Sequence, residues 1–388
     1  MKSLIAVQGT AQFITAYIAF LWHEEKILKE KSEAVLLVYD TSVPEDEDLF
    51  KNSILSMASI QEWHKIVFIS TEEMKKISSN IYAKCISKLV TKLDEANFDN
   101  IYIARDFGSF GTQLIINSYP SSVKIEYGDS FGLIGNQDEL KITMAVFFNN
   151  PLMIAKTIIK QLIYLQFPSR FNFDLTILSI PLIWDRRYLK GKNIVIPEMK
   201  FVRSVFSRLA NQFTDLQIFC ESLLYTSEAK PNVYLLSNLY NSGFSTIKNE
   251  VDLYEEVIFE TAKPGQTIIL KNHPRGSNII MQSLKERLSK NFIVLLVDDE
   301  RFKFLPIELW EKLFQRAIIY PIFSSSVISL RYLFATNVVM SLNDEKIFRY
   351  IFPNKVAESI HSEEMCHEAS DALFNWDEKS PLWIRKDT

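Results

Sequence analysis

A histidine in the second half of the chain is placed where it could assist the departure of a phosphate. In the segment IILKNHPRGS (residues 268–277), an apolar run leads directly into His273 and Pro274. Proline fixes its own backbone and keeps the preceding residue extended, so the direction of the imidazole is set. A histidine held in this way can donate a hydrogen bond or a proton to a leaving phosphate near neutral pH, and Arg275 adds a fixed positive charge. The candidate phosphate site at this turn consists of Asn272, His273, Pro274, Arg275 and Gly276.

Three consecutive serines form a second candidate anion site. Ser324, Ser325 and Ser326 follow the predicted strand of IIYPIF and open an apolar helical segment. Their hydroxyls can donate hydrogen bonds, and the backbone N–H groups and dipole of a helix N-terminus favour an anion such as phosphate. The alternative interpretation is ordinary helix capping, for which one serine is enough.

An acid in a glycine-rich turn is the candidate general base. In IEYGDSFGLIG (residues 125–135), Asp129 follows a predicted strand and lies among Gly128, Gly132 and Gly135. A carboxylate at a strand end can take the proton of a sugar hydroxyl when partial burial moves its pKa towards the working pH. The alternative is a turn residue that bonds only to its own backbone.

All three segments follow predicted strands, and strands alternate with helices along most of the chain. The strands are predicted at 4–9, 34–40, 65–70, 100–104 and 123–129, and then at 232–238, 266–273, 291–299, 316–323 and 337–342. Apolar strands separated by helices indicate parallel sheets covered on both faces. We therefore predict an α/β fold with two Rossmann-like domains facing a central cleft, where ligands bind outside the carboxyl ends of the strands.

The domain boundary is predicted near residue 190. The first domain would comprise residues 1–190 and the second 191–388, with the last helix a candidate for packing back on the first domain. The Phe- and Ile-rich segment 138–190 is predicted to be helical packing near this junction, and a part of the acceptor site. The acids that follow the strand at 291–299 are interpreted as a polar turn and not as a metal site; they are Asp298, Asp299 and Glu300.

Composition excludes several classes of protein. The 388 residues are 47% hydrophobic and 23% charged, which argues against a disordered chain. The formal charge of −4 provides no general field for a nucleic acid, and three scattered cysteines provide neither a disulfide framework nor a zinc motif. Polar residues interrupt the apolar N-terminus, which favours a strand and helix over a signal peptide, and no long apolar run indicates a membrane-spanning helix.

Taken together, the motifs resemble those of bacterial sialyltransferases and polysialyltransferases with two Rossmann domains (GT-B fold). The resemblance implies that His273 assists departure of the nucleotide phosphate and that Ser324, Ser325 and Ser326 hold that phosphate. The segment LPIELW is similar to the Pro-x-Glu element of the group. By this likeness, Glu308 would accept hydrogen bonds from the ribose hydroxyls of a cytidine nucleotide.

The acid motif departs from the pattern of the group. Two acids followed by Gly are usual there, whereas this chain has a single Asp129 between Gly128 and Ser130. Asp129 is the favoured base, and Glu126 stays open as the alternative. The N-terminal VQGTAQFITA is similar in position to the first strand-turn of the lipooligosaccharide sialyltransferases. The candidate acceptor-side residues are Gly9, Thr10, Gln12, Glu126, Gly128 and Ser130.

The resemblance implies an inverting glycosyltransferase that moves sialic acid, or a related nonulosonate, from a CMP-activated donor to a hydroxyl of a bacterial surface glycan. The first domain would bind the oligosaccharide or glycolipid acceptor and the second the CMP-sugar. We expect no cofactor, because hydrogen bonds and a helix N-terminus can stabilise a single leaving phosphate without a metal ion. The analogy also predicts a cytoplasmic enzyme with peripheral contact at the inner membrane.

Three alternatives stay open at this point. A CDP-glycerol or NDP-hexose transferase would share the architecture and the His-Pro turn. An epimerase acting on a nucleotide sugar would share the fold but release no glycoside. A non-catalytic scaffold that binds glycans or proteins would explain the altered acid motif, although not the presence of both His273 and the serines.

Overall fold

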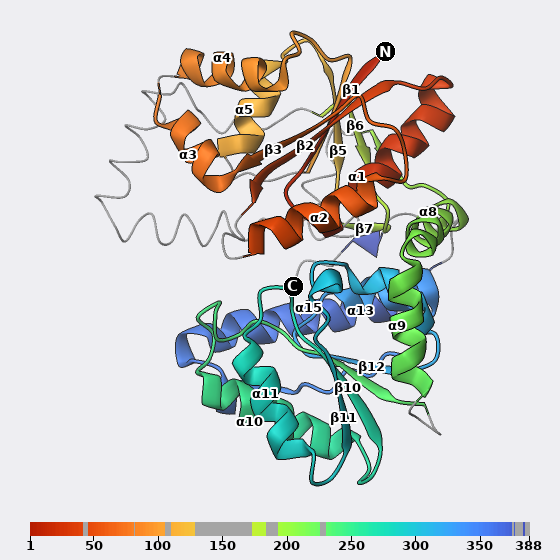
Figure 1. Cartoon of the computed structure of the whole chain (residues 1–388), viewed down its shortest axis with the longest axis vertical. Helices are drawn as coiled ribbons and strands as arrows, with labels where there is room; N and C mark the ends of the chain where they lie inside the picture. The colour runs from red at the N-terminus through yellow and green to blue at the C-terminus, as the bar shows by residue number, and fades with distance from the viewer. Residues whose placement is uncertain are drawn as a thin grey trace. The chain divides into compact units, whose positions relative to one another are not determined.

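The structure, a computed structural model, describes residues 1–41, 46–80, 82–104, 110–128, 173–183, 193–225, 230–374, 376 and 383–384. The chain forms two compact units (Figure 1). Unit 1 contains residues 1–44, 61–198 and 381–388, and unit 2 contains residues 45–60 and 199–380. A short early segment, which includes helix α2 (Glu47–Ala58), thus belongs to the unit built mainly from the second half of the chain.

Unit 1 is built on a seven-stranded parallel sheet with the order β3-β2-β1-β4-β5-β6-β8. Its strands are β1 (Lys2–Val7), β2 (Glu33–Thr41), β3 (Lys65–Ser70), β4 (Asn100–Ala104), β5 (Val123–Tyr127), β6 (Leu175–Ile177) and β8 (Ile194–Val195). Two further short strands, β7 (Leu182–Ile183) and β13 (Trp383–Ile384), pair in parallel with each other. β4 is buried along its whole length and β1 is buried except at Lys2, as expected for a sheet covered on both faces.

Helices cover both faces of this sheet. On one face, α3 (Thr71–Ser78), α4 (Tyr82–Leu93) and α5 (Phe110–Ser118) pack on alternate residues of β1, β2 and β4 (Figure 1). On the other face, α1 (Thr10–His23) packs through aromatic rings, and Phe20 meets Tyr102 edge to face with ring centroids 5.5 Å apart. A π-helical turn, η1 (Glu24–Leu28), follows α1.

Unit 2 has a four-stranded parallel sheet with the order β11-β10-β9-β12. The strands are β9 (Asn232–Leu235), β10 (Thr267–Lys271), β11 (Ile293–Val297) and β12 (Ile318–Pro321). The longer helices are α8 (Met199–Gln212), α9 (Thr214–Tyr225), α10 (Ile247–Thr261), α11 (Asn278–Leu288), α13 (Ser326–Phe334), α14 (Asp344–Tyr350) and α15 (Val356–Phe374). The short ones are η4 (Glu300–Phe302), η5 (Ile307–Leu309), α12 (Glu311–Phe314) and η6 (Pro353–Lys355). The α/β class with parallel sheets is therefore confirmed.

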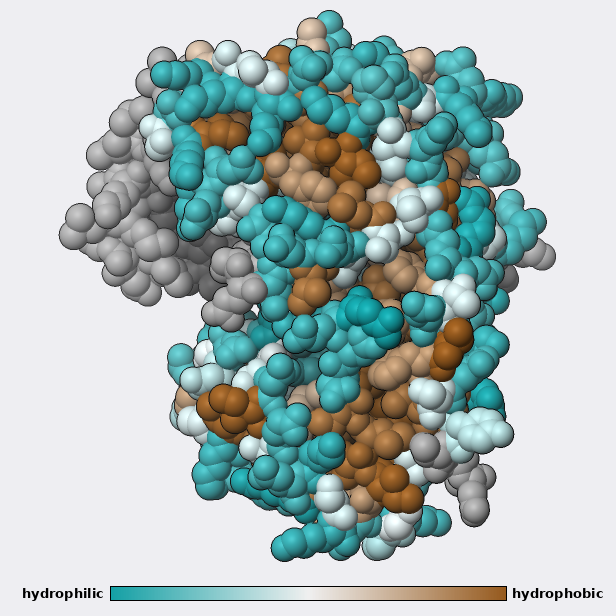
Figure 2. Space-filling view, viewed as in Figure 1, coloured by the Kyte–Doolittle hydropathy of each residue, from teal (hydrophilic) through white to brown (hydrophobic). Residues whose placement is uncertain are grey.

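The core of unit 2 lies where α10 and α11 pack on one face of this sheet, and α15 packs on α13. Hydrophilic residues cover much of the visible surface of the molecule, with hydrophobic residues in separate patches (Figure 2). Within the described residues, no helix is long and apolar enough to cross a membrane.

Two predictions of secondary structure are wrong. Residues 337–342 do not form a strand: Val338 makes one isolated bridge to Ile319, because the chain turns away into the cap of α14 at Asn343. The end of the segment predicted as helical packing contains two short strands, β6 and β7, and β6 extends the sheet of unit 1 beside β5. Residues 129–172 and 184–192 lie outside the described part of the chain.

Candidate functional site

The turn after β10 holds the predicted phosphate-binding residues in one rigid unit. Gly276 donates its backbone N–H to the carbonyl of His273 at 2.8 Å, which closes a β-turn with Pro274 and Arg275 at its centre. Proline in the second position and glycine in the fourth suit such a turn. The carboxamide of Asn272 packs so closely on Gly276 that a Cβ there would overlap it. The structure therefore brings these five predicted residues together.

A hydrogen bond within this turn sets the tautomer of His273. The backbone N–H of Arg275 donates to Nδ1 of His273 at 3.0 Å, so Nδ1 is an acceptor and the ring proton of neutral His273 is on Nε2. Burial among protein atoms is the main cause that lowers the pKa of His273, and the charges of Lys271 and Arg275 lower it further. His273 as a whole residue is nevertheless exposed to solvent. A neutral histidine thus presents Nε2–H as a hydrogen-bond donor.

A second loop supports the turn from the side of β9. Asn241 donates from Nδ2 to the carbonyl of Arg275 at 2.8 Å. The loop that carries Asn241 is fixed by the buried carboxylate of Glu250, which accepts the backbone N–H groups of Leu239 at 3.2 Å and Tyr240 at 2.7 Å. Glu250 also accepts from the hydroxyl of Tyr254 at 2.8 Å. The position of the His-Pro turn therefore depends on α10 as well as on β10.

Two oppositely charged side chains are buried beside this turn without pairing. Lys271, the last residue of β10, is 7% exposed, and Glu308 of η5 is 1% exposed. Burial lowers the pKa of Lys271 to about 8, although the nearby Glu308 and Cys220 act to raise it. Burial raises the pKa of Glu308 to about 7. Within the described residues, Lys271 contacts the ring of Trp310, with Nζ 5.0 Å from its centroid, and pairs with no carboxylate.

Glu308 is tied to the serine helix by one of its two oxygens. Ser329 of α13 donates its hydroxyl to Oε1 of Glu308 at 2.5 Å. Oε2 of Glu308 is buried and has no hydrogen-bond partner in the described part of the chain. Since a buried polar atom without a partner is costly, this oxygen is a candidate for a ligand hydroxyl.

The predicted serines begin α13 but do not cap it with their side chains. Ser325 is the N-cap residue, and its hydroxyl makes no capping hydrogen bond. Among the described residues, the hydroxyls of Ser324, Ser325 and Ser326 have no hydrogen-bond partner. Phe323, which precedes them, has φ of +52°, so the chain turns sharply between β12 and the serines. The hydroxyls are therefore available to a ligand at the start of a nine-residue helix.

A small cavity of about 110 Å³ lies at the carboxyl ends of β10 and β11. Lys271, Asn272 and His273 line one side, and Asp298 and Asp299 line the other. Asp299 accepts the backbone N–H of Arg301 at 3.0 Å and its guanidinium at 2.6 Å, and it caps η4. Asp299 therefore lies in a polar turn, as predicted, and whether the segment binds a metal stays untested.

In unit 1, the structure brings together the ends of β1 and β5. Gly9 is the N-cap residue of α1, and Gln12 in the first turn accepts the backbone N–H of Gln8 at 2.8 Å. Thr15 of the same helix donates to the carbonyl of Gly128 at 3.1 Å. The predicted acceptor-side residues Gly9, Thr10, Gln12 and Gly128 therefore belong to one region.

Of the two candidate bases, Glu126 and Asp129, the structure describes only Glu126. Glu126 lies on β5, is fully buried, and accepts the hydroxyl of Thr176 on β6 at 2.7 Å. This places it between two strands of the sheet. Asp129 and its neighbour Ser130 lie outside the described residues.

Sequence reasoning missed Lys271, Ser329 and Trp310. A lysine at the end of an otherwise apolar strand, two residues before His273, was a signal for a buried cation facing the same side of the sheet. Ser329 lies one helical turn after Ser325 and Ser326, a spacing that puts it on the same helix face. Neither pattern reveals burial by itself.

The fold has counterparts among solved structures. The chain is similar to UDP-GlcNAc 2-epimerase from Neisseria meningitidis bound to UDP-GlcNAc, with 11% identity, a TM-score of 0.51 and 97% of each chain covered. UDP-GlcNAc 2-epimerase from Methanocaldococcus jannaschii has 13% identity and a TM-score of 0.48, with 99% of this chain and 96% of that chain covered. E. coli ADP-heptose LPS heptosyltransferase II has 11% identity and a TM-score of 0.39, with 95% and 100% covered. The first of these likenesses shows the GT-B fold. No curated protein sequence matches the chain.

The fold is of the GT-B type. The sequence matches the alpha-2,8-polysialyltransferase (POLYST) family over residues 25–343, most of its length. The chain belongs to this family and is a glycosyltransferase. The resemblance to the bacterial sialyltransferase and polysialyltransferase group is thereby confirmed.

Proposed function

We propose that the protein transfers sialic acid, or a related nonulosonate, from a CMP-activated donor to a hydroxyl of a bacterial surface glycan, with inversion at the anomeric carbon. Membership in the alpha-2,8-polysialyltransferase family supports the sugar. The likeness to nucleotide-sugar epimerases, at 11% identity, concerns the fold alone.

One observation carries the nucleotide assignment: the buried Oε2 of Glu308 has no partner in the described part of the chain. A ribose hydroxyl donated to this oxygen would satisfy it without adding a charge. The buried ammonium of Lys271 lies near this carboxylate and can attract the phosphate of the same nucleotide. A nucleoside monophosphate carries both groups that the site lacks.

The leaving phosphate would be stabilised by hydrogen bonds and fixed charges. Nε2–H of His273 would donate to a phosphate oxygen, and the hydroxyls of Ser324, Ser325 and Ser326 would donate to the same group. Negative charge grows on this phosphate as the bond to the anomeric carbon breaks, so these contacts strengthen in the transition state. A phosphate dianion beside His273 would also raise its pKa again and favour proton transfer. We propose that the reaction needs no metal ion.

The acceptor hydroxyl would lose its proton to an acid of unit 1. We propose Asp129 for this role, because Glu126 is already engaged with Thr176 inside the sheet. The attack would occur on the face opposite to the departing CMP, which inverts the anomeric centre.

The test is turnover of defined donors by the full chain in the presence of EDTA. CMP-sialic acid, CDP-glycerol and UDP-hexoses are compared by release of nucleotide, with and without acceptor. We expect that, of these donors, only CMP-sialic acid releases its nucleotide. We also expect this release to be lost in Asp129→Asn and His273→Ala. Preference for CDP-glycerol or a UDP-hexose would replace the donor assignment. Full transfer in both variants would reject the mechanism, and no turnover of any donor would favour the scaffold.

A further inference from the structure

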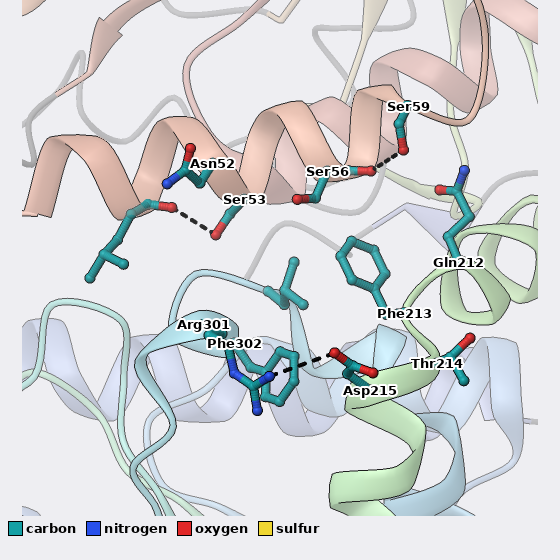
Figure 3. Close-up of a pocket in the computed structure, with 12 residues that line it drawn as sticks. Asn52, Ser53, Ser56, Ser59, Gln212, Phe213, Thr214, Asp215, Arg301 and Phe302 are labelled. Atoms are coloured by element: carbon teal, nitrogen blue, oxygen red, sulfur yellow. Dashed lines mark hydrogen bonds and ion pairs between the residues drawn. The ribbon is translucent and has the colours of Figure 1, made fainter.

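Unit 2 contains a second cavity, of about 550 Å³, that the donor site does not use. One wall is a face of α2, and the opposite wall is the turn between α8 and α9 together with the segment after β11 (Figure 3). Its volume lies within the range of about 300–1,000 Å³ that is typical of small-molecule sites. Phe302 lines both this cavity and the smaller cavity of His273, so the two cavities are neighbours.

The face of α2 at this cavity is polar but uncharged. Asn52, Ser53 and Ser56 of α2 lie along one wall of the cavity (Figure 3). Ser56 follows Ser53 by three positions and Asn52 by four, which places it on the same helix face as each of them. None of the charged residues of α2 lines the cavity. Of its apolar residues, Leu49 lines the cavity, whereas Ile54 and Met57 are buried and do not.

Several of these polar groups are available to a ligand. Ser53 donates to the carbonyl of Leu49 at 3.0 Å, so its hydrogen is already used. The side chains of Asn52, Ser56, Gln212 and Thr214 have no hydrogen-bond partner among the described residues. Two amides and two hydroxyls can both donate and accept, which matches the hydroxyl groups of a sugar.

The charges at the cavity neutralise one another. Arg301 bonds to Asp299 at 2.6 Å, and its guanidinium lies 3.6 Å from Asp215. No other cation lines this cavity among the described residues. A carboxylate or phosphate would therefore meet a guanidinium that is already paired, and the carboxylate of Asp215, so a neutral ligand is favoured over an anion.

Apolar side chains provide the remaining surface. Phe213 is half-buried at one wall, and Phe302 and Leu305 form a buried base. A sugar ring has an apolar face of C–H groups as well as hydroxyls at its edge, so it suits a wall of this mixed character.

We propose that this cavity binds an uncharged oligosaccharide built of hexose or hexosamine units. The inference rests on the proposed function only for the role of this oligosaccharide, which is that of the neutral part of the acceptor. The cavity then determines acceptor specificity from a position beside the donor site.

The probe is lacto-N-neotetraose, a neutral tetrasaccharide, titrated into the full chain by protein-observed NMR. Ser56→Trp fills the cavity, and Asn52→Ala removes an amide from its wall. We expect Ser56→Trp to weaken binding roughly tenfold or more, and Asn52→Ala by a few-fold. The matched control is Leu55→Trp, because Leu55 is 43% exposed on the same helix and does not line the cavity. This variant should bind as the wild type does.

Oligosialic acid, an α2,8-linked anionic oligomer, is the competing probe. Binding of oligosialic acid that is tighter than that of the tetrasaccharide and equally sensitive to Ser56→Trp would overturn the inference. Equal binding of the tetrasaccharide by wild type and Ser56→Trp, or no binding by wild type at 10 mM, roughly the weak limit for a specific site, would overturn it as well.

The donor assay keeps the two proposals separate. If CMP-sialic acid is not turned over but tetrasaccharide binding still depends on Ser56, the donor assignment fails and this inference stands. If transfer occurs and Ser56→Trp leaves both the acceptor KM and tetrasaccharide binding unchanged, the inference fails and the donor assignment stands. Urea denaturation of each variant reports whether unit 2 is folded, independently of the donor.

Discussion

The hydroxyl of Ser329 donates to Oε1 of Glu308 at 2.5 Å, which joins the serine helix α13 to η5 at the predicted nucleotide site. Glu308 is 1% exposed and Ser329 is 1% exposed, so the pair is shielded from water. The hydrogen bond fixes Oε1, and it leaves Oε2, which has no partner in the described part of the chain, available to a ligand.

We expect Ser329→Ala to weaken CMP binding and to destabilise the protein. The change leaves a buried acceptor unsatisfied, which costs about 1–3 kcal/mol of unfolding free energy. It also removes a contact that favours the charged carboxylate, so the pKa of Glu308 rises further. Calorimetric titration with CMP and urea denaturation measure the two effects. Ser222→Ala is the control. The hydroxyl of Ser222 donates to a helix carbonyl at 2.7 Å, on the exposed face of α9. An equal change in both variants would show that Ser329 has no special role.

We expect Lys271→Met to keep or raise stability while it weakens CMP binding. The variant removes a buried ammonium that pairs with no carboxylate in the described residues, and a buried charge of this kind is unfavourable. Loss of a charged hydrogen bond to phosphate, worth about 1.5–3 kcal/mol, would reduce affinity roughly tenfold or more. A large loss of stability at pH 8 would contradict this assignment.

The same variant tests the pKa of Lys271. Folding lowers this pKa from 10.5 to about 8, so between pH 8 and 10.5 the unfolded chain binds more protons than the folded one. The contribution of Lys271 to stability therefore rises with pH across this window and is at its lowest below pH 8. Denaturation midpoints at pH 8 and 10 should show a contribution that Lys271→Met lacks. Lys312→Met, which removes an exposed lysine paired with Glu221 at 2.9 Å, should retain it.

We expect Gly276→Ala to disturb the His-Pro turn and Asn272→Ala to relieve it. A Cβ at Gly276 overlaps the carboxamide of Asn272, whereas the double variant removes that carboxamide. Gly276→Ala alone should therefore cost about 1–3 kcal/mol by overpacking. In a double-mutant cycle, the cost of Gly276→Ala should be smaller when residue 272 is alanine. Additive changes would mean that the overlap does not determine the turn.

We expect Asn241→Ala to raise the KM for the donor more than it lowers kcat. Asn241 supports the turn through the carbonyl of Arg275 and is exposed, so stability should change by less than about 0.5 kcal/mol. Asn80→Ala is a control with a comparable bond, since Asn80 donates to the carbonyl of Lys76 at 2.8 Å. Unchanged donor kinetics in Asn241→Ala would remove this residue from the positioning network.

Much of the fold followed from local patterns, because apolar strands and amphipathic helices repeat with their own periods. The strand predicted at residues 337–342 was wrong. Strand-like composition does not reveal whether a segment pairs with a neighbouring strand over more than one residue. No local pattern reveals the partner of α2: Phe50 packs on Phe304, 254 positions later, with ring centroids 5.6 Å apart.

The site was predictable where chemistry is visible in residue type and hidden where it depends on burial. His273, Glu308 and the serines have chemically distinctive neighbours in sequence. Among the residues that the structure describes, Lys271 has no ion pair and Oε2 of Glu308 has no hydrogen-bond partner, and both features arise only when η5, β10 and α13 meet. The positive φ of Phe323 is likewise a product of packing, since nothing in its side chain prefers that conformation.

The division of the chain has a consequence for its synthesis. The polypeptide passes from one unit to the other after residues 44, 60, 198 and 380. Helix α2 is therefore synthesised long before the strands of its own unit. Phe50 cannot make its contact with Phe304 until that later residue has been synthesised. A nascent chain that ends before Phe304 leaves the apolar face of α2, which includes Phe50, without its partner, and transiently exposed apolar surface of this kind favours aggregation.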